Sequence, residues 1–151
     1  IKSISLSANW MWPCKNEGED ARLFKAVEAI SEFAIDLGIN VPTGKDSLSM
    51  KQKYKNEEVI SPGTVIISAA ANCNNIANVV EPVLQKNGGA IYYIDFSGDA
   101  TGFNLGGSSF AQVLNKIGNN PPTINNNNSL KLAFDLIQKF LSFVKRLKMA
   151  E

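Results

Sequence analysis

Apolar and polar residues alternate at the start of the chain. Ile4, Leu6 and Ala8 are separated by serines at positions 5 and 7, which is the two-residue period of a strand with one buried face. We expect this strand to end within residues 9–13, a segment with two tryptophans followed by a proline.

The next pattern has the period of a helix. Apolar residues recur at steps of three or four, as on one face of an amphipathic helix, at Leu23, Val27, Ile30, Ala34 and Leu37. Glu17, Glu19 and Asp20 precede this face, and Gly38 follows it. Acidic residues at the start and a glycine at the end predict a helix that stops at Gly38.

Further elements follow in alternation. The patterns predict, in order, a short strand at 39–41, a strand buried on both faces at 64–69, a strand at 90–96, and helices at 110–117 and 130–147. Alternating strands and helices are typical of the α/β class, which we expect here. We place a domain boundary near residues 55–62 and interpret the asparagine tract at 125–128 as a surface loop.

Composition narrows the classes of function. Of the 151 residues, 44% are hydrophobic and 19% are charged, and the net charge is +1. A chain of this length buries roughly 70% of its unfolded surface, so it needs no disulfide or metal for stability. Nucleic acid is not an expected partner, because phosphate-driven binding requires a basic excess on one face. The chain has no histidine, which excludes His-dependent nucleophiles and His-ligated zinc within it.

The two cysteines, Cys14 and Cys73, lie far apart and match no metal-ligand spacing. We expect two small buried thiols in a reducing compartment, without a disulfide. No apolar run reaches the roughly 18 residues that span a bilayer, and no signal-peptide core opens the chain, so we expect no membrane partner. The chain starts at Ile1, directly in a strand pattern, which suggests a piece of a longer polypeptide.

One segment invites comparison with a phosphate-binding P-loop. It follows a predicted strand and consists of Gly44, Lys45, Asp46 and Ser47. The match fails because Ile39 stands where the first glycine is required, Asp46 occupies the Ser/Thr position, and residues 48–51 continue an extended alternation instead of a helix. Three interpretations stay open: a P-loop, another polar site in which Lys45 and Asp46 face an anionic ligand, and a solvated turn with a lysine–aspartate pair.

Three other features have a structural and a functional interpretation. Gly106, Gly107 and Ser108 open a predicted helix, where backbone N–H groups and the helix dipole suit a phosphate, but capping or close packing also explains them. Trp10 and Trp12 are either core or interface anchors, or platforms on which a ligand stacks. The acidic residues before the first helix either complement its dipole or hold Mg²⁺.

Five blocks along the chain resemble one enzyme family. They are LSANWMW at 6–12, GEDARL at 18–23, PTGKDSLSM at 42–50, SPGTVIISA at 61–69 and LGGSSFAQ at 105–112. With these blocks in this order, the chain resembles the long, single-chain form of the phosphoribosylformylglycinamidine synthase family, within the aminoimidazole ribonucleotide synthetase superfamily. The resemblance covers almost all of residues 1–117, and the segment 125–151 is only loosely similar.

This resemblance implies the fourth step of de novo purine biosynthesis. Formylglycinamide ribonucleotide, ATP and glutamine give formylglycinamidine ribonucleotide, ADP, phosphate and glutamate, with ATP and Mg²⁺ as cofactors. ATP phosphorylates the amide oxygen of the substrate, and ammonia from a separate glutaminase domain displaces the phosphate. In such chemistry the protein mainly positions the reactants and neutralises charge.

The resemblance also implies an α/β fragment that joins two halves of a synthetase copy. Residues 1–58 finish an N-terminal half that builds a shared barrel, and residues 59–151 begin the C-terminal half. The implied partners are a small-molecule nucleotide substrate and the remaining domains of the parent chain, including the glutaminase domain. No nucleic acid and no membrane are implied, and the expected location is the cytoplasm. The family's magnesium-binding helix falls outside this piece.

Seven residues carry over as substrate- or nucleotide-binding candidates: Gly44, Lys45, Asp46, Ser47, Gly106, Gly107 and Ser108. No catalytic residue and no metal ligand is expected in this chain, and the isolated 151 residues are expected to be inactive. The alternative is a non-catalytic structural or interaction segment of the same enzyme that binds no nucleotide alone.

Overall fold

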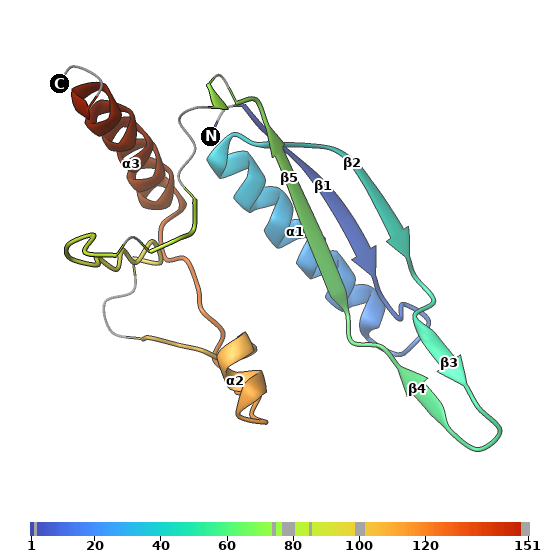
Figure 1. The fold of residues 1–151 in the computed structure, drawn as a ribbon. Helices are drawn as coiled ribbons and strands as arrows, with labels where there is room; N and C mark the ends of the chain where they lie inside the picture. Colours follow the sequence, from blue (N-terminus) through green and yellow to red (C-terminus); the bar gives the residue numbers. More distant parts are fainter. Residues whose placement is uncertain (2, 74, 77–80, 85, 99–101, 149–151) are drawn as a thin grey trace. The chain divides into compact units, whose positions relative to one another are not determined.

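The computed structural model describes residues 1, 3–73, 75–76, 81–84, 86–98 and 102–148 (Figure 1). Contacts divide the chain into two units, Ile1–Asn74 and Asn75–Glu151. Strands and helices are mixed along the chain, which confirms the expected α/β class. The boundary expected between residues 58 and 59 concerns the two halves of the family architecture and stays a prediction.

A three-stranded sheet forms the centre of the first unit (Figure 1). Its strands are β1 (Ile4–Met11), β2 (Asn40–Ser47) and β5 (Thr64–Ala71), in the order β2-β1-β5. β2 runs parallel to β1, and β5 runs antiparallel to it. β1 is therefore the central strand, and β2 and β5 each have a free edge within this sheet.

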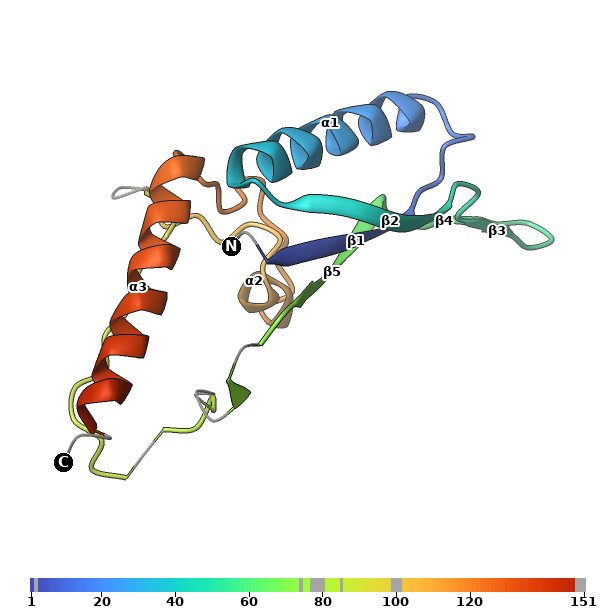
Figure 2. The ribbon, with the colours of Figure 1, turned by 90° about the horizontal axis from the view of Figure 1, so that it is seen from above.

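Helix α1 (Glu19–Leu37) connects β1 to β2 and lies across one face of the sheet (Figure 2). Gly38 ends it with φ of 74°, a left-handed conformation that glycine adopts at little cost, and donates a hydrogen bond from its N–H to the Ile35 carbonyl. Ala34 and Leu37 are buried on the helix and Ala8 is buried on β1. The predicted helix and its glycine stop are confirmed.

β1 and β2 are both longer than predicted, because they pair with each other up to Met11 and Ser47. Residues 44–47 are thus part of a strand, so the interpretation as a solvated turn is wrong. After Ser47 the chain stays extended and forms the hairpin of β3 (Lys51–Lys53) and β4 (Glu58–Ile60). No helix follows Asp46, so the P-loop interpretation is also wrong.

β5 is present where a strand was predicted, but it is not buried on both faces. Ile66 and Ile67 are neighbours whose side chains point to opposite faces, and they are 51% and 41% exposed. The physical reason is the position of β5 at the sheet edge. An apolar run forms a buried strand only where other elements cover both of its faces. In the described part of this unit, too few elements cover β5 to bury Ile66 and Ile67.

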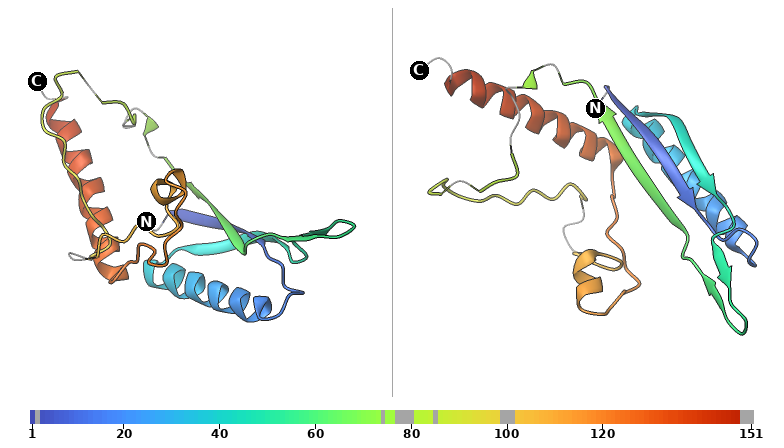
Figure 3. Two further views of the ribbon diagram at one scale, coloured as in Figure 1. Left: turned by 90° about the horizontal axis from the view of Figure 1, so that it is seen from below. Right: turned by 45° about the vertical axis from the view of Figure 1, so that its right-hand side comes forward.

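The second unit contains helices α2 (Ser109–Val113) and α3 (Asn127–Lys148), seen from two further sides in Figure 3. α3 starts earlier than predicted because the Asn126 Oδ1 accepts a hydrogen bond from the Ser129 N–H at 2.9 Å, which caps the helix. The expected loop at 125–128 is therefore wrong for residues 127–128. α2 is shorter than the predicted 110–117, because Asn115 turns the chain with φ of 54°.

The strand predicted at residues 90–96 is wrong. These residues pair with no strand in the described part of the chain, and Tyr92 and Tyr93 are each 85% exposed. The sequence supplies the strand propensity, but a strand also requires a neighbour that accepts its hydrogen bonds. Both cysteines are free thiols; Cys14 is half-buried and Cys73 is exposed, so the expectation of burial is wrong for Cys73.

Candidate functional site

The first candidate segment forms the carboxyl end of β2, beside the carboxyl end of β1. Gly44, Lys45, Asp46 and Ser47 pair in register with Ala8, Asn9, Trp10 and Met11, respectively. A β-carbon at Gly44 would lie only 2.5 Å from the carbonyl oxygen of Ala8. The glycine therefore allows the two backbones to approach each other closely at this point.

Alternation along β2 separates the two charged candidates. Successive strand residues point to opposite faces, so Lys45 and Ser47 share one face and Asp46 lies on the other. The Lys45 Nζ donates a hydrogen bond to the Ser47 Oγ at 2.5 Å. In the described part of the chain, no ion pair joins Lys45 to Asp46. The structure brings Lys45 and Ser47 together and places Asp46 apart from them.

This strand end borders an open hollow of about 370 Å³. Its lining comes from β1 and β2 and consists of Ala8, Trp10, Val41, Pro42, Thr43, Gly44, Lys45 and Asp46. Lys45 and Asp46 are exposed to solvent. The candidate segment thus lies at a hollowed surface and is accessible to a ligand.

Backbone hydrogen bonds hold the chain just beyond the candidate segment. The Trp12 N–H donates to the Ser47 carbonyl at 2.8 Å, and the Cys14 N–H donates to the Leu48 carbonyl at 3.1 Å. Trp12 is 6% exposed and Pro13 is fully buried. Of the two tryptophans, Trp12 is therefore a core anchor, whereas Trp10 is half-buried and lines the hollow.

The β3–β4 hairpin carries an ion pair close to this region. The Lys51 Nζ lies 2.7 Å from the Glu58 Oε1 and donates a hydrogen bond to the Asn16 Oδ1 at 3.1 Å. The hydrogen bond from Lys51 is the main cause that lowers the pKa of the Glu58 carboxyl below its usual value, and the charges of Lys51 and Lys53 add to it. These contacts connect the hairpin to the loop before α1.

The second candidate segment lies in the other unit, and its backbone N–H groups already have acceptors. Those of Gly106, Gly107 and Ser108 donate to the carbonyls of Asn120, Ile117 and Leu105, respectively. The Ser108 Oγ accepts from the Ala111 N–H at 3.2 Å and so caps α2. Gly106 also lines a hollow of about 340 Å³ that contains Lys116. The capping interpretation is supported, and the phosphate contact stays a prediction.

Two of the three acidic residues near the start of α1 stabilise the helix. Glu19 and Asp20 occupy its first turn, where negative charge complements the helix dipole. The Glu19 Oε1 accepts a hydrogen bond from the Arg22 guanidinium at 2.6 Å. Among the residues that the structure describes, no three carboxylate or thiol groups come together as a metal site.

The sequence did not predict that Asn9 lies beside Lys45 on the adjacent strand. The two residues pair in register on adjacent strands, and the Asn9 Oδ1 is buried without a hydrogen-bond partner. The available signal was the polar row of β1, in which Ser5, Ser7 and Asn9 alternate with apolar residues. The register that joins this row to β2 has no signature in the local sequence.

Comparison with known proteins identifies relatives. Residues 1–72 match the family model of the FGAR-AT PurM_N-like domain, which coincides closely with the first unit. The chain is 39% identical over 143 residues to a probable phosphoribosylformylglycinamidine synthase of Caenorhabditis elegans, a match that covers 94% of this chain and 11% of that protein.

Two further relatives carry the same enzyme name. A probable phosphoribosylformylglycinamidine synthase, chloroplastic/mitochondrial, of Arabidopsis thaliana is 38% identical over 144 residues, which are 94% of this chain and 10% of that protein. The phosphoribosylformylglycinamidine synthase of Saccharomyces cerevisiae is 37% identical over 134 residues, which are 87% of this chain and 10% of that protein. The chain thus spans about a tenth of the length of these relatives.

These matches confirm the family resemblance that the five sequence blocks indicated. They extend past the first unit, since the match to the first relative covers 94% of the chain. In the described part of the chain, no helix has the length and apolar character needed to cross a membrane.

Proposed function

We propose that this chain is part of an ATP-dependent amidotransferase of purine biosynthesis, which converts formylglycinamide ribonucleotide to formylglycinamidine ribonucleotide with glutamine as the nitrogen donor. The observation that carries the proposal is the identity of 37–39% to enzymes of that name, along 87–94% of this chain. The reaction belongs to the complete enzyme, of which this chain is about a tenth of the length.

Within that enzyme, this chain contributes residues that bind the substrate or nucleotide. Lys45 supplies a positive charge at an accessible strand end, and its contact with the Ser47 hydroxyl fixes the position of the ammonium group. Phosphoryl transfer to an amide oxygen builds negative charge, which a positioned lysine stabilises. Asp46 and Gly44 line the neighbouring hollow. Gly106, Gly107 and Ser108 complete the proposal as a second ligand-binding segment.

ATP and Mg²⁺ are the proposed cofactors of the complete enzyme. The donor set around Lys45 fits a phosphate group, because an ammonium and a hydroxyl lie side by side there. The described residues supply no cluster of metal ligands, so we assign no step to a metal held by this chain. The glutaminase domain, the division of the chain at residues 58 and 59, and the cytoplasm as location are parts of the same proposal.

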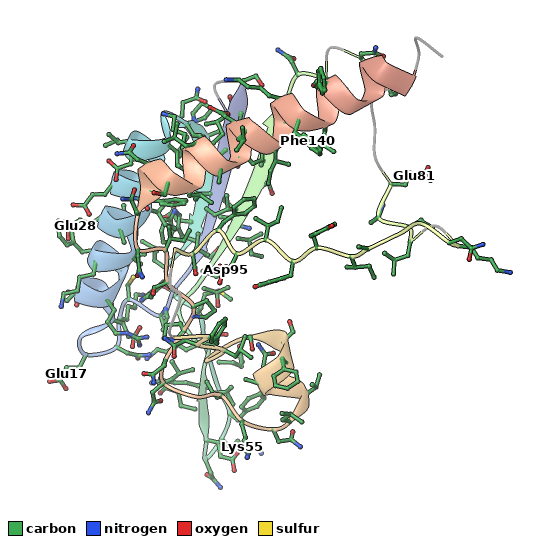
Figure 4. The ribbon with its side chains drawn as sticks, turned by 90° about the vertical axis from the view of Figure 1, so that its left-hand side faces the viewer. Glu17, Glu28, Lys55, Glu81, Asp95 and Phe140 are labelled. Atoms are coloured by element: carbon green, nitrogen blue, oxygen red, sulfur yellow. The ribbon has the colours of Figure 1, made fainter. Side chains whose placement is uncertain are left out.

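The test is an activity assay on the full-length protein that carries this chain. With formylglycinamide ribonucleotide, magnesium-ATP and glutamine, we expect formation of formylglycinamidine ribonucleotide together with ADP and glutamate. Lys45→Ala should lower kcat/KM at least tenfold, whereas Lys55→Ala, at the tip of the exposed hairpin (Figure 4), should leave it unchanged. Equal activity of the two variants would favour the non-catalytic interpretation of this segment, and no product from the unmodified protein would refute the proposed reaction.

A further inference from the structure

Asn87 and Gly88 form the sole asparagine–glycine pair of the sequence. They lie in the second unit, where residues 86–98 belong to no helix and no strand and residues 86–87 form a turn. Both residues of the pair are exposed, and the nearby Leu84 and Ile91 are 81% and 80% exposed. Solvent therefore has access to this pair and to the backbone around it.

The backbone of the pair is held by few contacts. Asn87 has φ of 62°, in the left-handed region that asparagine tolerates but does not strongly favour. Among the residues that the structure describes, none forms a hydrogen bond with the Asn87 side chain or with the Gly88 N–H. Gly88 has no β-carbon, so the backbone rotates there at little steric cost. The Asn87 carboxamide can therefore approach the Gly88 nitrogen.

These two groups can react with each other. Once a base has removed its proton, the Gly88 backbone nitrogen is a nucleophile that attacks the Cγ carbon of Asn87. The new N–Cγ bond closes a cyclic imide, the Cγ–Nδ2 bond breaks, and Nδ2 leaves as ammonia after taking up a proton. Water then adds to either carbonyl of the imide, and the ring opens to aspartate or to isoaspartate.

Asn115 provides a comparison within the same unit. Its φ of 54° is close to that of Asn87, but the residue after it is Lys116, whose β-carbon hinders the approach of the backbone nitrogen. That nitrogen also donates a hydrogen bond to the Ala111 carbonyl at 2.9 Å. The glycine and the unbonded N–H therefore distinguish Asn87 from Asn115, whereas the left-handed backbone is common to both.

We propose that Asn87 is a site of spontaneous deamidation, at which an uncharged amide becomes a carboxylate with water as the co-reactant. The reaction lowers the formal net charge of the chain by one from its value of +1. Where the product is isoaspartate, the backbone also becomes one methylene longer, just before residues 90–96. The modification requires no enzyme, and it does not depend on the proposed function.

The experiment incubates the full-length protein that carries this chain at neutral pH and follows each asparagine by peptide mass spectrometry. We expect Asn87 to be lost at least tenfold faster than Asn115, with more isoaspartate than aspartate as product and a rate that rises with pH. A second sample in urea gives the rate in the unfolded chain. Because few contacts hold Asn87, we expect the native rate to lie within tenfold of the rate in urea.

Two variants test the chemistry. Gly88→Ala adds a β-carbon beside the nucleophile and should slow the loss of Asn87 at least tenfold, and Asn87→Gln should abolish isoaspartate at this position because the corresponding ring is larger. The rate at Asn115 should be the same in both variants and in the unmodified protein. A native difference between Asn87 and Asn115 of less than tenfold, or a native rate more than tenfold below the rate in urea, would overturn the inference. Aspartate without isoaspartate would exclude the imide.

Discussion

Gly63 lies against the indole ring of Trp12. A β-carbon at Gly63 would stand 2.4 Å from the ring carbons Cε2 and Cζ2, closer than non-bonded carbons approach. Trp12 is 6% exposed, and its backbone N–H donates a hydrogen bond to the Ser47 carbonyl at the end of β2. The contact therefore connects the start of β5 to the strand end that carries the candidate residues.

Replacing Gly63 by alanine should destabilise the first unit. The added methyl group overlaps the ring, and a large buried side chain shifts only at a cost of about 1–3 kcal/mol. Urea denaturation followed by tryptophan fluorescence measures the loss. In a Trp12→Leu background the smaller side chain leaves room, so Gly63→Ala should then cost less; equal costs in both backgrounds would contradict the proposed contact.

Gly44→Ala should weaken the pairing of β1 and β2. The new β-carbon would meet the Ala8 carbonyl oxygen at 2.5 Å, and a backbone atom in the central strand yields less easily than a side chain. We expect faster hydrogen exchange at the Trp12 N–H, which bonds to the Ser47 carbonyl, and a lower unfolding midpoint. Unchanged exchange at this amide would show that the strands tolerate a methyl group here.

The β3–β4 hairpin should loosen in acid. The pKa of Glu58 is lowered in the folded state, mainly by the hydrogen bond from Lys51. The ionised Glu58 carboxylate therefore contributes to stability at pH values above its ordinary pKa of 4.5. This contribution is lost as the pH falls through the lowered pKa. Amide shifts of residues 51–53 as a function of pH measure this transition. Glu58→Gln should abolish it, whereas Glu57→Gln, the same change one residue earlier, should retain it.

Ser108→Ala should destabilise α2 locally. The substitution removes the acceptor for the Ala111 N–H and the donor to the Leu105 carbonyl, which lie 3.2 and 2.6 Å from the Ser108 Oγ. Loss of such a cap costs about 0.5–2 kcal/mol. Hydrogen exchange at Ala111 measures it, with Ser109→Ala as the control. Exchange that is equally slow in both variants would remove the capping role of Ser108.

Local sequence patterns predicted the elements that local physics determines. Apolar residues spaced three or four positions apart, followed by Gly38, predicted α1, and the alternation of apolar and polar residues from Ile4 to Ala8 predicted β1. Features that depend on contacts between distant parts of the chain could not be predicted from local patterns. The sequence near residues 90–96 does not show that this strand-like segment has no pairing partner in the described chain. The helix cap at Asn126 was missed because Asn126 lies within a run of asparagines that resembles a loop.

The candidate site was predictable in part for the same reason. The glycine and lysine of residues 44–47 indicated a polar segment, but whether Lys45 and Asp46 face one ligand depends on secondary structure. In a turn both can point the same way, whereas in β2 they cannot. The pairing of Asn9 with Lys45 depends further on a register shift between Ser5 and Ser7, which no local pattern encodes.

That shift also determines the sign of charge that the sheet presents. If β2 slid by one position along β1, Asp46 would take the place of Lys45 beside the polar row of β1, so the same amino acids would repel an anion and attract a cation. The alignment of β2 with β1 therefore determines which charged side chain lies on each face of the sheet. The close approach of Gly44 to Ala8 favours this alignment, although neither residue carries a charge.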